Sequence, residues 1–145
     1  MLPTLLPEVL QYVSDSHYAV REGVMYVLLQ MAQHCYPTVL YHHTTIVPAI
    51  VSGLNDTEPT VQRLACRLCE FFFEQLQPST VALYLPVFMP KLVALMSSEV
   101  LDVKLVAIGS TGPVAAAADK HYLPFLQVCD LHNAGGKFPC SLFFC

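Results

Sequence analysis

Apolar residues recur at helical spacing along most of the chain, most clearly in the segment 44–76. Its first part, from about Thr44 to Leu54, carries apolar residues three and four positions apart, as the buried stripe of a helix does. Asn55, Asp56 and Thr57 supply the chemistry of a turn and a helix N-cap, and Pro59 suits the first turn of a second helix. That helix has apolar residues at Val61, Leu64, Ala65, Leu68, Phe72 and Leu76. The segment therefore predicts a helical hairpin.

The same pattern occurs three times. The copies align without gaps around a proline, and the steps between copies are 41 and 42 residues. Eight residues after the proline comes a short polar residue, and thirteen after it comes a valine followed by a long polar residue. These positions are Pro7, Pro48 and Pro90; Asp15, Asp56 and Ser98; Val20, Val61 and Val103; and Arg21, Gln62 and Lys104. A period of about 40 residues is typical of stacked helical hairpins.

A single hairpin cannot cover its own apolar faces, whereas stacked hairpins can, so the repeat predicts an all-α solenoid. We expect repeats at about 1–40, 41–80 and 81–121, with a partial fourth at 122–127. The prolines within the first helices are expected to set the curvature, and Gly112-Pro113 to break or kink the second helix of the third unit. The segment 128–145 is atypical, with Gly135-Gly136 and no helical period, and we leave open whether it is disordered or caps the last repeat.

The repeat resembles the HEAT type, in which a turn aspartate and a basic residue pair between neighbouring repeats as a ladder. The residues that carry this likeness are Asp15, Arg21, Asp56, Gln62 and Lys104. Arg63 stands beside Gln62 as a second basic candidate. Gln62, and Ser98 at the third turn, depart from the charged pattern.

The amino-acid sequences of several expected helices resemble those of the importin-beta (karyopherin) family, and of its importin-four-like branch in particular. The similar runs are CEFFFEQL at 69–76, YLPVFMPKL at 84–92, AIGS at 107–110, AAAADK at 115–120 and YLPF at 122–125. The resemblance implies a right-handed superhelix that recognises cargo proteins in import into the nucleus. It also implies the small GTPase Ran and nucleoporins as partners, and a location in cytoplasm and nucleus. The alternative is a HEAT-repeat scaffold or regulatory subunit unrelated to transport.

Composition and motifs argue against several other classes of protein, namely disordered, nucleic-acid-binding, membrane-spanning and metal-binding proteins and enzymes. The chain of 145 residues is 54% apolar and 12% charged, which excludes a disordered chain, and its net charge of −4 argues against nucleic acid as a partner. Prolines and charges interrupt the longest apolar runs, so we expect no membrane span. The CxxC at Cys66 and Cys69 lacks the second pair of a zinc module, and the CxxH at Cys129 and His132 is isolated. No phosphate-binding loop or catalytic signature occurs, so we expect no metal, no cofactor and no enzyme activity.

One polar stripe is the candidate site for partner proteins. Arg63, Arg67, Glu70 and Glu74 follow one another at steps of four, three and four, opposite the apolar face of their helix. The stripe is either a solvated face with local ion pairs or a surface that binds a partner. In importin-like superhelices the second helices line the inner face, and the resemblance would place these four residues there. The adjacent triplet at 71–73 cannot point into one core, so we expect at least one phenylalanine to pack against the next repeat. The alternative is an exposed aromatic patch that binds a partner.

Overall fold

The computed structural model describes residues 2–124, and every regular element in that range is helical. The elements are α1 (Leu2–Leu10), α2 (Tyr18–His34), the 3₁₀ helix η1 (Thr38–His42), α3 (His43–Leu54), α4 (Pro59–Glu74), α5 (Pro78–Met96), α6 (Leu101–Ala118) and η2 (Asp119–Tyr122). The tail at 128–145 and the last three residues of the expected partial unit lie outside the described residues.

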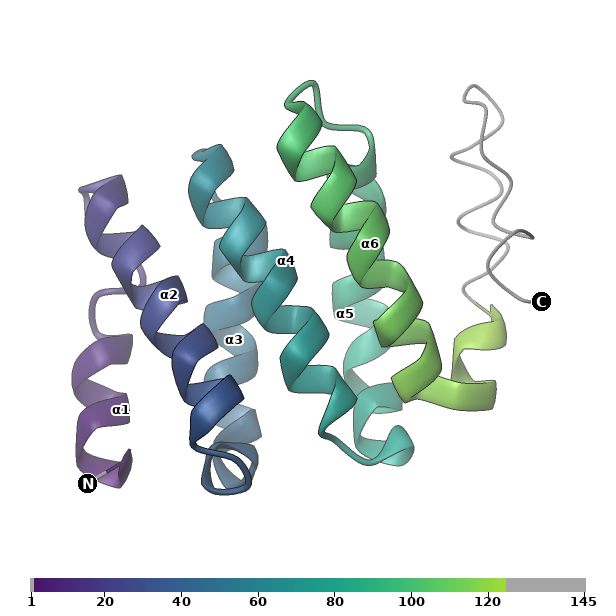
Figure 1. The fold of residues 1–145 in the computed structure, drawn as a ribbon, viewed down its shortest axis with the longest axis horizontal. Helices are drawn as coiled ribbons and strands as arrows, with labels where there is room; N and C mark the ends of the chain where they lie inside the picture. The colour runs from purple at the N-terminus through teal and green to yellow at the C-terminus, as the bar shows by residue number, and fades with distance from the viewer. Residues whose placement is uncertain (1, 125–145) are drawn as a thin grey trace.

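The helices form two layers (Figure 1). The second helices, α2, α4 and α6, lie side by side in one layer, α3 and α5 lie in the layer behind them, and α1 stands next to α2 at the end of the stack. The units follow one another along the long axis in chain order, and each packs on its neighbours. The all-α, HEAT-type solenoid predicted from the repeat is confirmed.

The core lies between the layers and between successive units. Residues at the same repeat position are buried in the second and third hairpins, because each hairpin covers the apolar face of the next one. Val61 and Val103 are both fully buried, whereas Val20, at the same position in the first hairpin, is 39% exposed. Stacking therefore buries the apolar stripes that one hairpin leaves open.

The phenylalanine triplet packs as the helical geometry requires. Phe72 and Phe73 are buried, while Phe71 is only partly so. Phe73 lies edge-on against Phe88 of the following hairpin, with ring centroids 4.7 Å apart, and its ring is 6.3 Å from that of Tyr84. The expected packing between repeats is confirmed, since α4 and α5 belong to successive units.

Prolines begin some helices and lie inside others. Pro59 and Pro78 occupy the first turns of α4 and α5, where no N–H donor is needed. Pro113 lies inside α6, which runs without a break from Leu101 to Ala118, so the expected break does not occur. The carbonyl that loses its donor belongs to Gly109, which is exposed and therefore open to water. In the preceding turn, the hydroxyl of Thr111 donates to the carbonyl of Ile108 at 2.6 Å.

Two apolar segments have the length and composition of a membrane span, although no span was expected. They are α5 and the stretch from Leu101 to His121. Both are core elements of the solenoid, and the buried face of α5 includes Val81, Phe88 and Leu92. The helical stack buries part of these apolar residues, whereas others, including Leu83 and Leu105, are exposed.

Candidate partner-binding surface

The polar stripe runs along α4, the middle helix of the second-helix layer. Arg67 and Glu74 are exposed, and Arg63 and Glu70 are partly buried at the edges of the stripe. The apolar residues of the same helix, Val61, Ala65, Leu68 and Phe72, are all buried on its other side. The helix thus presents two cations near its N-terminal end and two carboxylates near its C-terminal end.

The charges of the stripe have few partners in the described residues. Arg63 lies 3.8 Å from Asp102 on α6, and the two side chains are 43% and 72% exposed. An ion pair this long and exposed contributes little to stability. Burial raises the pKa of Glu70, and repulsion from Glu74 adds to the shift, while Arg67 opposes it. Arg67 and Glu74 are therefore available to an external partner at little cost to the fold.

Neighbouring helices extend this surface with apolar groups that the sequence reasoning missed. Tyr26 on α2 has the repeat position of Arg67, and Leu105 on α6 has that of Arg63. Tyr26 is 55% exposed and Leu105 is 57% exposed. The repeat register could have revealed them, because residues one period apart leave a solenoid on the same side. We call the face of α2, α4 and α6 that carries Tyr26, the stripe and Leu105 the second-helix face.

The ladder residues meet at the junction between the first two hairpins. The Nε and Nη2 groups of Arg21 donate to the two carboxylate oxygens of Asp56 at 2.7 and 2.9 Å. Arg21 bonds Asp15 only through the backbone carbonyl, at 2.8 Å, and Gln62 likewise donates to the backbone carbonyl of Asp56. The side chain of Arg21 is 14% exposed and that of Asp56 is 8% exposed. The hydrogen bond from Arg21 lowers the pKa of Asp56, and burial acts in the opposite direction.

We call the ion pair of Arg21 and Asp56 the clasp, and the junction between the second and third hairpins lacks an equivalent pair within the described residues. Gln62 stands where Arg21 would be, and Lys104 makes no ion pair within the described residues. Ser110 instead donates its hydroxyl to the backbone carbonyl of Cys66 across the junction, at 3.2 Å. The ladder is therefore one charged clasp followed by a neutral contact.

Cys66, Cys69 and His43 take structural positions, and the CxxH at Cys129 and His132 lies outside the described residues. Cys66 and Cys69 are buried on α4, and burial raises the pKa of the Cys66 thiol to about 12. Among residues 2–124, no three His, Cys, Asp or Glu side chains gather closely enough to hold a metal ion. His43 is the first residue of α3, and its Nδ1 shares a 2.6 Å hydrogen bond with the hydroxyl of Tyr84 on α5. His43 thus links two units rather than capping a helix.

Comparison with known proteins supports the importin resemblance. No model of a known protein family matches the chain. The chain is 27% identical over 127 residues to the probable importin subunit beta-4 of Schizosaccharomyces pombe, which covers 87% of this chain and 12% of that protein. The crystal structure of Kap121p matches 88% of this chain and 13% of its own with a TM-score of 0.83 and 26% identity. Kap121p bound to Pho4p matches 90% of this chain and 13% of its own, with a TM-score of 0.84 and 25% identity.

The chain therefore spans about an eighth of the length of the relatives it matches. These relatives are an importin-beta subunit and a karyopherin, and the structural match extends over nearly all of the described helices. The likeness to the importin-beta (karyopherin) family is thereby confirmed, and the chain is a HEAT-repeat segment similar to one part of such a receptor.

Proposed function

We propose that this chain is a protein-binding segment of a nuclear transport receptor and contributes to cargo recognition in import into the nucleus. The observation that carries the proposal is the match to Kap121p, whose solved complexes include those with Pho4p, Ste12p, Nup53p and the SUMO protease Ulp1p. The segment acts by binding, without a chemical step, and works in cytoplasm and nucleus. Ran and nucleoporins are partners of the whole receptor in this proposal.

The second-helix face is the proposed contact surface. Its exposed groups are an aromatic side chain on α2, charges on α4 and an aliphatic side chain on α6, contributed by Tyr26, Arg67 and Leu105. Interfaces combine apolar anchors of this kind with a polar surround. Arg63 and Arg67 precede Glu70 and Glu74 along the stripe, so the face distinguishes partner segments by the order of their own charges.

A capture experiment with the full chain tests this proposal. The immobilised chain is exposed to cytosol, and bound proteins are quantified for the parent and for the double variant Arg67→Glu, Glu74→Arg. Lys91→Glu, a charge reversal on the first-helix layer at α5, is the matched control. The proposal expects a set of nuclear proteins that the double variant loses and the control keeps.

Addition of Ran locked in its GTP form separates transport from scaffolding. Release of the captured proteins by Ran-GTP supports a transport role for this segment. Capture without Ran sensitivity supports a cargo-binding segment that depends on the rest of the receptor for release. Capture that the stripe variant and the control leave equally unchanged would refute the second-helix face as the contact surface.

A further inference from the structure

The face of α6 that continues the polar stripe of α4 is apolar. Four residues stand on α6 one period after the four stripe residues, namely Leu105, Gly109, Gly112 and Ala116. Leu101 precedes Leu105 by four residues and so lies on the same side of the helix. Leu101 is 63% exposed and Leu105 is 57% exposed. We call these five residues the α6 apolar strip, a helix side that the described residues leave largely open.

The middle of the α6 apolar strip has room for a side chain from elsewhere. A Cβ added at Gly109 or Gly112 would meet no heavy atom within 4 Å beyond its own helix backbone and its chain neighbours. At the same two repeat positions α4 carries the long side chains of Arg67 and Glu70. The strip is therefore a bare helix surface beside two exposed leucines, and covering it would remove apolar area from water.

Residues 138–145, beyond the described part of the chain, form the apolar end of the tail. They read FPCSLFFC, which contains three phenylalanines, one leucine and no charged residue. A run of large apolar residues favours a covered position, because exposed apolar surface is unfavourable in water. This segment and the α6 apolar strip thus match in chemistry, since neither carries a charge.

The lengths of the segment and the strip also match. The chain leaves α6 through η2, which packs on α6, and the described residues end at Pro124. From Pro124 to Phe138 the chain can extend over about 46 Å, whereas α6 with its 18 residues is about 27 Å long. Residues 138–144 can extend over about 20 Å, close to the roughly 22 Å from Leu101 to Ala116. The segment can therefore lie along the whole strip.

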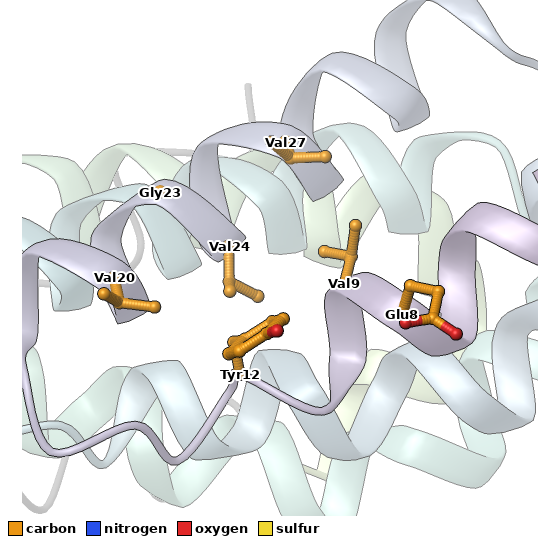
Figure 2. Close-up of a pocket in the computed structure, with 7 residues that line it drawn as sticks. All are labelled: Glu8, Val9, Tyr12, Val20, Gly23, Val24 and Val27. Carbon is orange, nitrogen blue, oxygen red and sulfur yellow. The ribbon is translucent and has the colours of Figure 1, made fainter.

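A second apolar surface lies at the other end of the stack and is less open. It is a pocket of about 350 Å³ between α1 and α2, where Tyr12 and Val24 face one another (Figure 2). Val24 is buried and Tyr12 is half exposed, so the walls of the pocket cover part of its own apolar surface. The α6 apolar strip is also nearer to the tail along the chain, and a shorter loop costs less entropy to close. The strip is thus the favoured site for the segment.

We propose that residues 138–144 lie along the α6 apolar strip of the same chain, with a phenylalanine side chain over Gly109 and Gly112. This position removes the exposed leucines and the phenylalanines from water together. The polar stripe of α4 stays free, because covering Arg67 and Glu74 with apolar groups would cost their solvation. The contact occupies Leu105, so a partner that anchors there must displace the segment. That consequence rests on the proposed function, whereas the contact itself does not.

A natural thiol in the segment reports whether it is covered. Cys140 lies two residues after Phe138, and its reaction with iodoacetamide at pH 8 is followed by mass mapping in the full chain and in a peptide of residues 125–145. We expect Cys140 to react about tenfold more slowly in the full chain, since a covered thiol reacts only when its contact opens. Equal rates in chain and peptide would overturn the proposal. Protection that increases with chain concentration would show a second copy on the strip and would also overturn it.

Matched substitutions locate the contact. Leu105→Glu should raise the rate at Cys140 to that of the peptide, while Leu83→Glu, the same change at an exposed leucine of α5, should leave it unchanged. Phe143→Glu should act like Leu105→Glu, and the two together should add little. Val20→Glu, in the wall of the pocket between α1 and α2, should have no effect. Release of Cys140 by Val20→Glu or Leu83→Glu, without a response to Leu105→Glu, would place the segment elsewhere and refute the proposal.

Discussion

Replacement of the three adjacent phenylalanines one at a time gives a direct measure of how the units hold together. Phe73 is 1% exposed and lies edge-on to Phe88 of the next hairpin, whereas Phe71 is only partly buried. Phe73→Ala should cost about 3–5 kcal/mol for the lost burial and the cavity, with about 0.5–1.5 kcal/mol of this range arising from aromatic geometry. Phe71→Ala should cost about 1 kcal/mol.

Equilibrium unfolding in urea, followed by far-ultraviolet circular dichroism, checks this difference. With an m-value of about 2 kcal/mol per molar urea, a loss of about 4 kcal/mol shifts the midpoint by about 2 M. Phe73→Leu, which keeps much of the apolar volume, should fall between Phe73→Ala and the parent chain. Equal midpoints for Phe71→Ala and Phe73→Ala would refute the assignment of Phe73 to the junction between units.

Three further predictions concern the charged clasp and the thiols. Arg21→Ala should destabilise the chain clearly more than Arg63→Ala in thermal unfolding, because the first loses a two-pronged bond to a buried carboxylate and the second a long, exposed pair. The pKa of Asp56 is lower in the folded chain than its unfolded value of about 4, so the stability that the ionised carboxylate contributes is fully present above that value and is lost as pH falls through the lower folded pKa. The difference in unfolding free energy between the parent and Asp56→Asn should therefore shrink as pH falls below about 4 and stay unchanged between pH 6 and 8. In the folded chain at pH 8, iodoacetamide should modify Cys35 well before Cys66, and mass mapping that found the reverse order would contradict the buried, protonated state of the Cys66 thiol.

Repetition made the architecture predictable from the sequence. Apolar spacing located the helices, and the recurring proline, aspartate and valine fixed where each hairpin begins and turns. The α3 helix begins at His43, one residue from its expected start at Thr44, and α4 begins at Pro59 as its fixed backbone angle suggests. Asp56 stabilises the turn before α4, because its carboxylate accepts the N–H of Glu58. The N-cap residue of α4 is Glu58, which follows the expected segment at 55–57.

Contacts between units were less accessible from the sequence. The resemblance implied that a turn aspartate and a basic residue pair between neighbouring repeats, and Arg21 does reach forward to Asp56, but it did not reveal that only this junction carries a largely buried charged pair among the described residues. The bond between His43 and Tyr84 likewise depends on how α3 and α5 lie together, which no local pattern reports. The exposed groups on α2 and α6 became recognisable once the repeat register placed Tyr26 and Leu105 beside the stripe.

The serial arrangement of hairpins has a mechanical consequence. Because each unit packs on its neighbours in series, a force applied along the long axis of the stack passes through every junction in turn. The first junction carries the Arg21–Asp56 clasp, and the next one carries neutral contacts, among them the Phe73–Phe88 ring pair and the His43–Tyr84 hydrogen bond. Small changes of angle at successive junctions add up along such a stack, because the units are joined in series while every helix keeps its own hydrogen bonds.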